Sequence, residues 1–264
     1  MGKAADSSND DIYIAVADGV GTLVLNRPSK RNAITEAMWH KMPALLEQLE
    51  ADDAVRLVSV VGAGGHFGAG NDIAELPALH AEAHVAARFA QTMADGIARL
   101  ASLKKPTVAV IRGQCYGASL ALTLATDLRF AAEDAVFAIT PAKLGALYLK
   151  SDMARLFEAV GRARSLEMIY TARPVGAPEA QSIGLINRAV PLAHFDETLV
   201  DLEKQIVTLS SFTMMTTKAM MRPSPEDPLA ETDESLEWWL SAVRGRDFAE
   251  GVSAFLSRRP PRFV

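Results

Sequence analysis

The sequence predicts an α/β fold in which buried strands alternate with amphipathic helices. Short apolar runs at 57–61 and 107–111 have the length and the β-branched composition of buried strands. The longer segment 85–100 repeats apolar residues at helical spacing. Strands that alternate with helices indicate a mixed α/β core. With 264 residues, 49% of them hydrophobic, the chain can form one large domain or a domain with a helical appendage.

The first half of the chain opens with a predicted β-hairpin. Its strands are 12–16 and 22–25, and residues 18–21, with the sequence Asp-Gly-Val-Gly, form the turn between them. Thr35 is the predicted N-cap of the first helix. Apolar residues follow it at helical spacing: Met38, Met42, Leu45, Leu46 and Leu49.

The second half of the chain continues with strands and helices before it becomes wholly helical. Residues 118–125 are apolar on all sides and predict a buried helix. Short strands are expected at 128–131, 135–139 and 185–190, and helices at 151–160 and 165–171.

Three regions are therefore expected along the chain. Residues 1–11 are small and polar, without the apolar core of a secretion signal, and form a disordered lead-in. Residues 12–194 form the α/β core, and residues 195–264 form a C-terminal helical region. Methionine and tryptophan are frequent in that region, which favours a core or a subunit interface over a ligand site.

Composition narrows the classes of function. A net charge of −5 argues against general nucleic-acid binding. The five His are scattered without metal-ligand spacing, so no metal site is expected. Cys115 is the single cysteine, which excludes an internal disulfide and fits a reducing compartment such as the cytoplasm. No apolar run approaches the roughly 20 residues of a membrane span.

Two turns of small residues, at 65–73 and 113–119, repeat one arrangement. Each follows an apolar run typical of a strand and opens an apolar run typical of a helix. Small residues let a ligand approach the backbone closely, and free N–H groups at a helix start bind negative charge. Two such amides aimed at one point would form an oxyanion hole for an enolate or a tetrahedral oxyanion.

Several motifs resemble those of the crotonase (enoyl-CoA hydratase/isomerase) superfamily over nearly the full length. Residues 25–33, Leu-Asn-Arg-Pro-Ser-Lys-Arg-Asn-Ala, resemble the "LNRP…NA" opening of that family. Residues 67–73, Phe-Gly-Ala-Gly-Asn-Asp-Ile, resemble its "FSAGADI" loop. Further similar segments are 105–127, 137–145, 180–186 and 250–259.

The resemblance implies a spiral of ββα units with a C-terminal helical region that forms a homotrimer, often a dimer of trimers. It implies an acyl-CoA thioester as ligand, which is a substrate, and no other cofactor. The motif match places the two oxyanion amides on Asn71 and Ala118. Because the backbone N–H is the donor, the side chains at these positions can vary, and the side chain of Asn71 can add a polar contact of its own.

The same resemblance assigns residues that bind coenzyme A (CoA). They are Lys30 and Arg31 beside the phosphates, Ala69, Asp72 and Ile73 around the adenine and pantetheine, and Phe255 and Arg258, which reach the CoA of a neighbouring subunit. Two alternatives stay open. Lys30 and Arg31 also fit a solvated surface pair, and Phe255 also fits simple helix packing.

The side chains that move protons in the family are missing here. Its hydratases use two Glu, and the matching positions are Ala121 and Pro141. Some isomerases and dehalogenases of the family place an acid four residues after a glycine, and Leu149 holds that position. None of these three side chains transfers a proton, which argues against ordinary hydration of an enoyl-CoA.

Four nearby side chains remain as candidates, each with a structural alternative. Tyr148 could donate to an enolate, but the favoured interpretation is a tyrosine in the pocket wall or on the surface. Asp152 is the nearest carboxylate, and the favoured interpretation is that Ser151 or Asp152 caps the following helix. Cys115 is interpreted as a small buried residue, and His66 as a loop residue near the mouth of the site.

The leading hypothesis is thus a crotonase-type lyase or isomerase that acts on an acyl-CoA through a thioester enolate held by Asn71 and Ala118. Decarboxylation is a further possibility because loss of CO₂ forms the enolate without a side-chain base. A protein that only binds acyl-CoA is the competing hypothesis, favoured by the absent Glu pair. A purely structural oligomer is a third, which the intact turns argue against.

Overall fold

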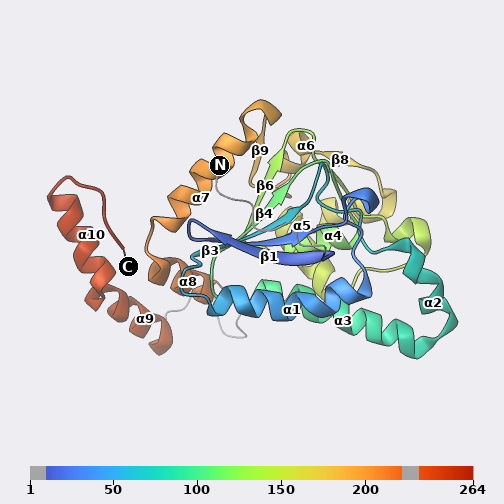
Figure 1. Cartoon of the computed structure of the whole chain (residues 1–264), viewed down its shortest axis with the longest axis horizontal. Coiled ribbons are helices and arrows are strands. Elements are labelled where there is room, and N and C mark those ends of the chain that lie inside the picture. The colour runs from blue at the N-terminus through green and yellow to red at the C-terminus, as the bar shows by residue number, and fades with distance from the viewer. Residues whose placement is uncertain (1–9, 222–231, 264) are drawn as a thin grey trace.

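The computed structural model describes residues 10–221 and 232–263 (Figure 1). A sheet of six strands has the order β1-β2-β3-β4-β6-β9, and a second sheet has the order β5-β7-β8. The strands of the first sheet are β1 (Ile12–Ala17), β2 (Val20–Leu25), β3 (Leu57–Gly62), β4 (Thr107–Ile111), β6 (Leu128–Ala132) and β9 (Arg188–Val190). Those of the second are β5 (Gln114–Tyr116), β7 (Val136–Ala138) and β8 (Val175–Gly176).

The chain steps repeatedly from the large sheet to the small one. Strands β4 and β6 run parallel in the large sheet, and each is followed within a few residues by a strand of the small sheet, β5 and β7, which also pair in parallel. Helix α4 (Ala118–Leu124) follows β5. These successive strand–strand–helix steps match the expected ββα units.

The large sheet separates two apolar cores. Alternate residues of a strand point to opposite faces. In β4, Ala109 and Ile111 belong to the core beneath α1 (Glu36–Ala51) and α3 (Ala83–Ser102), which lie side by side, while Val108 and Val110 face α7 (Phe195–Val207) (Figure 1).

Several predicted elements are confirmed. Strands β1 and β2 form the antiparallel hairpin, and its turn residues Asp18 and Gly19 have positive φ, as a tight hairpin turn requires. The hydroxyl of Thr35 accepts a hydrogen bond from the N–H of Met38 at 3.2 Å and caps α1. All residues of α4 are buried.

The two helices predicted at 151–160 and 165–171 are the halves of α5 (Lys150–Thr171), which breaks at Gly161. The predicted strand at 185–190 is too long, because only its end, β9, pairs with the sheet. Part of the second predicted turn is itself a strand, β5, which pairs with β7. Two α-helices of the described residues are only six residues long, α2 (Leu76–Ala81) and α6 (Ala177–Ser182).

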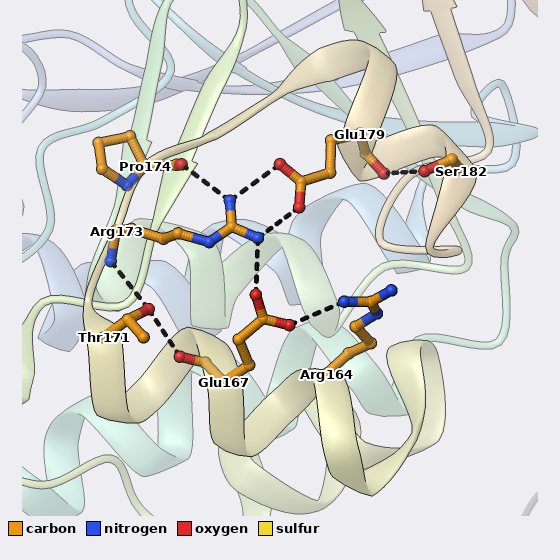
Figure 2. Close-up of polar contacts among 7 residues, drawn as sticks. All are labelled: Arg164, Glu167, Thr171, Arg173, Pro174, Glu179 and Ser182. Atoms are coloured by element: carbon orange, nitrogen blue, oxygen red, sulfur yellow. Dashed lines mark hydrogen bonds and ion pairs between the residues drawn. The ribbon is translucent and has the colours of Figure 1, made fainter.

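An exposed group of ion pairs joins the end of α5 to α6 (Figure 2). Arg173 binds both carboxylate oxygens of Glu179 and also lies 3.0 Å from Glu167 Oε1. Glu167 Oε2 accepts a hydrogen bond from Arg164 at 2.8 Å. These hydrogen bonds lower the pKa of Glu167 and of Glu179.

From Phe195 onward the described residues form helices: α7, α8 (Ser211–Met220), α9 (Asp233–Arg244) and α10 (Arg246–Leu256). Figure 1 shows α9 and α10 standing apart from the body that contains the two sheets. The expected lead-in lies mostly outside the described residues, and of its last residues Asp11 accepts a hydrogen bond from the N–H of Asn26. Within residues 10–221 and 232–263, no helix is long and apolar enough to cross a membrane.

Candidate active site

The two turns of small residues lie side by side. Gly68 forms a parallel bridge with Cys115 of β5, and its N–H donates to the carbonyl of Gln114 at 2.9 Å while its own carbonyl accepts from the N–H of Tyr116 at 2.9 Å. After this bridge the two turns stay close together, because a methyl group on Gly70, the residue before Asn71, would lie 3.3 Å from the amide nitrogen of Ala118.

Glycine is required where the turns touch. Gly70 and Gly117 both have positive φ, +97° and +53°. A methyl group on Gly70 would lie 3.0 Å from the carbonyl oxygen of Tyr116 and 3.3 Å from the amide nitrogen of Ala118. The N–H of Gly70 donates to the buried hydroxyl of Ser119 at 3.0 Å. The two glycines, the two backbone hydrogen bonds of Gly68 and the hydrogen bond from Gly70 to Ser119 therefore set the spacing of the turns.

The N–H groups of Asn71 and Ala118 have no hydrogen-bond acceptor within the described residues. Both residues line one cavity of about 130 Å³. Its walls also include Ala121, Pro141, Tyr148 and Asp152. Two unpaired donors at one cavity can together bind a single acceptor atom, such as a carbonyl oxygen.

The first turn is braced by the opening motif. Arg27 Nη1 lies 2.8 Å from Asp72 Oδ2 and 2.7 Å from the carbonyl oxygen of Ala33. Asp72 also accepts the N–H of Ala74, and both contacts lower the pKa of the Asp72 carboxyl, with the bond from Arg27 the larger cause. The Asp72 carboxylate is therefore occupied within the chain.

Buried Asn32 connects the same motif to the loop after β3. Its Nδ2 donates to the carbonyl oxygens of Ala63 and His66 at 2.8 and 2.7 Å. The Nδ1 atom of His66 accepts the N–H of Gln114 at 3.1 Å. His66 thus ties the first turn to β5, and it is not among the residues that line the cavity.

The side chain of Asn71 is held by two helices. Its Oδ1 accepts a hydrogen bond from Trp39 Nε1 of α1 at 2.9 Å, and its Nδ2 lies 3.5 Å from Met93 Sδ of α3. The polar contact expected of this side chain is therefore made within the chain. The unpaired backbone N–H remains as the donor that Asn71 offers to the cavity.

Tyr148 lines the cavity, and its hydroxyl proton already takes part in a hydrogen bond. Its hydroxyl donates to the carbonyl oxygen of Gly117 at 2.6 Å. That carbonyl belongs to the peptide group whose N–H is the unpaired donor of Ala118. Burial, with smaller effects of Cys115 and Asp152, raises the pKa of the phenol well above its usual range, so Tyr148 stays neutral.

The capping role expected for Ser151 or Asp152 is wrong. Leu149 is the N-cap of α5, and no side chain makes the capping hydrogen bond. Asp152 is instead almost fully buried, with one carboxylate oxygen, Oδ1, 3.1 Å from Arg155 Nη1. Burial raises the pKa of this carboxyl above its ordinary value although Arg155 lowers it.

The three residues that stand where the family's enzymes carry acids have no group that can transfer a proton. Ala121 and Pro141 line the cavity without a titratable group, and Leu149 ends the loop before α5. Cys115 is fully buried, as predicted, and burial raises the pKa of its thiol, so it stays protonated. Asp152 is the one carboxylate among the described residues that line the cavity.

The candidate CoA-binding residues of the first half lie together near the first turn. Lys30 and Arg31 are exposed, and the carbonyl of Arg31 accepts the N–H of Ala69 at 2.9 Å. Arg31 Nη1 also lies 3.1 Å from Gln114 Oε1. Ile73, next to Asp72, is 67% exposed and lines the cavity.

Phe255 and Arg258 are not brought to this cavity. Phe255 lies in α10 and is 84% exposed, and Arg258 follows that helix with an exposed side chain. Figure 1 shows α10 at the end of the molecule opposite α2. Within the described ranges, no group of three or more His, Cys, Asp or Glu is placed to hold a metal ion.

The supporting roles of Ser119, Asn32 and Trp39 were not anticipated. Ser119 and Asn32 lie inside the motifs that carry the family resemblance, so their position there was the available signal. Trp39 had no such signal, because its partner Asn71 is 32 residues away in the sequence.

Known proteins are similar to this chain in sequence over nearly its full length. The sequence profile of the enoyl-CoA hydratase/isomerase family matches residues 15–264. The 1,2-epoxyphenylacetyl-CoA isomerase of Escherichia coli is 32% identical over 260 residues, covering 94% of this chain and 96% of that protein. The 4-chlorobenzoyl coenzyme A dehalogenase-2 of Arthrobacter is 30% identical over 258 residues, covering 96% and 93%.

Solved structures share the fold as well. A crystal structure of an enoyl-CoA hydratase/isomerase family protein from Hyphomonas neptunium superposes with a TM-score of 0.91 at 35% identity, covering 96% of this chain and 97% of the other. The two chains thus share one fold over nearly their full length. The chain belongs to the enoyl-CoA hydratase/isomerase family of the crotonase superfamily.

Proposed function

We propose that the protein is an enzyme that acts on an acyl-CoA thioester through an enolate held by an oxyanion hole. The N–H groups of Asn71 and Ala118 are the two donors of that hole. The observation that carries the proposal is their placement, side by side at one cavity and without an acceptor within the described chain. Fixed donors of this kind stabilise a developing oxyanion more than a neutral carbonyl.

The ligand would extend from this cavity along the first turn. Lys30 and Arg31 supply exposed positive charge for the CoA phosphates. Ala69, Asp72 and Ile73 would frame the adenine and the pantetheine. Because the Asp72 carboxylate holds Arg27, we assign the contact at Asp72 to its backbone. The thioester is itself the substrate, and the chemistry requires no further cofactor.

The cavity favours enolate chemistry over ordinary hydration. Water addition needs groups that place a water molecule and move its proton, and neither Ala121 nor Pro141 can do so. Isomerisation and decarboxylation both pass through an enolate and need fewer proton carriers. A protein that only binds acyl-CoA is a second candidate, and these two apolar positions favour it.

We also propose a homotrimer, or a dimer of trimers. Large apolar side chains are exposed on α9 and α10, among them Trp239 at 61%, Phe255 at 84% and Leu256 at 76%. Exposed apolar surface of this extent indicates a covered interface. Since Phe255 and Arg258 lie far from the cavity of their own chain, any contact with CoA would be made to a neighbouring copy.

The proposal is tested by acyl-CoA binding and turnover in the wild type and in two glycine variants. Gly70→Ala would force the turns apart, whereas Gly65→Ala adds a methyl group with nothing within 4 Å and serves as the control. We expect micromolar binding and turnover of one member of an acyl-CoA panel. Gly70→Ala should lower turnover by about 100-fold or more, the effect of losing one oxyanion donor, and Gly65→Ala should leave it unchanged.

Two results would count against the proposal. Tight binding of the whole panel without turnover would favour the binding protein. Equal turnover in the two variants would show that the spacing of Asn71 and Ala118 is irrelevant to the reaction.

A further inference from the structure

We propose that Asp152 is the single proton-transferring residue of this site, and that the reaction is a one-base proton shift between two carbon atoms of an unsaturated acyl-CoA. The inference rests on the proposed function and adds to it the group that moves the proton. It also adds the substrate class, a thioester with its double bond between the β and γ carbons.

The position of Asp152 supports this assignment. It lines the same cavity as Asn71 and Ala118, and it is the only carboxylate among the described residues of that lining. Its side chain is 2% exposed, so bulk water has little access to it. Oδ1 is held by Arg155, whereas Oδ2 has no hydrogen-bond partner among the described residues and is the oxygen available for a proton.

Among the described residues, the other titratable groups near Asp152 do not compete with it for proton transfer. Arg155 on α5 is the cation beside it, and Tyr148 precedes the same helix. Cys115 of β5 approaches Tyr148 from the small sheet. The phenol is committed to the Gly117 carbonyl and the thiol is buried and protonated, so neither exchanges a proton readily.

The electrostatics suit a residue that takes and returns a proton. Burial raises the pKa of the Asp152 carboxyl, and Arg155 limits that rise. A carboxyl whose pKa lies nearer neutrality is a stronger base when ionised and still exists as the carboxylate. Arg155 is a positioning residue, because it fixes Oδ1 and turns Oδ2 into the free oxygen.

The step balances without water or any other co-reactant. The Asp152 carboxylate takes a proton from the α carbon, so a C–H bond breaks and an O–H bond forms. The electron pair spreads onto the thioester oxygen, where the amides of Asn71 and Ala118 hold the charge. The carboxylic acid then returns the proton to the γ carbon, and the double bond moves between the α and β carbons.

Water addition, by contrast, would require a second proton carrier. The described lining offers none, since the remaining polar wall groups are Thr140, the committed Tyr148 and the side chain of Asn71, which α1 and α3 hold. A single base that serves both carbons is the simplest chemistry that this cavity supports.

The test measures two reactions by the full-length protein. Exchange of the α protons of a saturated acyl-CoA with D₂O is followed by NMR, and conversion of 3-hexenoyl-CoA to 2-hexenoyl-CoA is followed by absorbance. We expect Asp152→Asn to slow both by about 100-fold or more while acyl-CoA affinity changes by less than about 3-fold. Asp152→Glu keeps a carboxylate and should retain part of the rate.

Glu203→Gln is the matched control. Glu203 is also a partly buried carboxyl whose pKa burial raises, but it binds Ser59 at 3.1 Å on the face of the sheet covered by α7. We expect wild-type rates from this variant. In the wild type, proton exchange should fall with decreasing pH through one ionisation that lies above the ordinary pKa of an aspartate.

The possible outcomes distinguish a failure of the Asp152 assignment from a failure of the proposed function. Exchange in Asp152→Asn within about 3-fold of the wild type, with intact binding, would overturn the assignment of Asp152 and leave the proposed function standing. Hydration of 2-hexenoyl-CoA faster than its isomerisation would also overturn it. Failure of the wild type to bind any acyl-CoA would overturn the proposed function itself.

Discussion

Helix α5 carries a carboxylate and an arginine three residues apart at each of its ends, and the two pairs differ in their surroundings. Near its start, Asp152 Oδ1 lies 3.1 Å from Arg155, and the Asp152 side chain is 2% exposed. Near its end, Glu167 Oε2 lies 2.8 Å from Arg164, and the Glu167 side chain is 36% exposed. The pKa of Asp152 is raised, and that of Glu167 is lowered.

The difference shows that an ion-pair partner alone does not decide the protonation of a carboxylate. At Glu167, hydrogen bonds from Arg164 and Arg173 outweigh a small cost of desolvation (Figure 2). At Asp152, desolvation outweighs the attraction of Arg155. The exposed pair therefore suits a structural contact, and the buried pair suits a group that exchanges protons.

The largest expected effect comes from removing Arg155, the arginine at the buried end of α5. Arg155→Met leaves Asp152 buried without its cation, so the unfolding free energy should fall by about 1–3 kcal/mol and the pKa of Asp152 should rise further. The acid limb of the pH–rate profile should then move to higher pH. Arg164→Met, the matched control, should alter neither the profile nor turnover. Chemical denaturation and pH–rate measurements check both variants.

Similar pH–rate profiles in Arg155→Met and Arg164→Met would contradict the difference between the two ends of α5. An unshifted pH–rate profile in Arg155→Met would mean that Asp152 does not titrate in the reaction. A shift of the same size in Arg164→Met would mean that the effect spreads through the whole helix.

A second expected effect is a pair of opposite pH dependences of stability. The folded pKa of Asp152 is raised, so the folded state binds more protons than the unfolded state, and wild-type stability relative to Asp152→Asn should fall as pH rises from 3.8. The pKa of Glu167 is lowered, so stability relative to Glu167→Gln should be present above pH 4.5 and should disappear as pH falls. Denaturation curves at several pH values would show slopes of opposite sign, and slopes of equal sign would contradict the account.

Tyr148→Phe should have a smaller effect, limited to catalysis. The phenol donates to the Gly117 carbonyl and polarises the peptide group that ends in the Ala118 N–H. Without it, we expect kcat to fall by about 3- to 10-fold while KM changes little. A change in KM alone would indicate that Tyr148 shapes the cavity rather than the donor.

The smallest effect is expected at the exposed end of α5. Arg173→Gln removes the ion pairs with Glu167 and Glu179, whose side chains are more than a third exposed. Exposed ion pairs contribute little to stability and are screened by salt. The melting temperature should fall slightly at low salt and match the wild type at high salt, with turnover unchanged. A loss of activity in this variant would show that α6 communicates with the cavity.

Much of the fold was predictable because its signals are local. The hairpin turn at Asp18 and Gly19, the cap at Thr35 and the buried helix α4 each depend on a few adjacent residues. Strands β5 and β8 were not predicted, since three and two residues are too few to show alternation.

The candidate site was predictable in its backbone and not in its side chains. Both turns lie in motifs, and their glycines indicated close approach. Asp152 was wrongly expected to cap α5 because residue type favours a cap there, whereas it is buried at a cavity whose other walls come from distant parts of the sequence. The hydrogen bond between Trp39 and Asn71 also joins residues far apart in the sequence, so the local sequence pattern does not indicate it.

The central claim is that the amides of Asn71 and Ala118 hold one thioester oxygen. The most direct measurement is a crystal structure of the protein with a saturated, unreactive acyl-CoA. We predict that the thioester oxygen lies about 2.7–3.1 Å from both amide nitrogens, with the α carbon facing Asp152. A thioester oxygen bound elsewhere, or hydrogen-bonded to neither amide, would contradict the account.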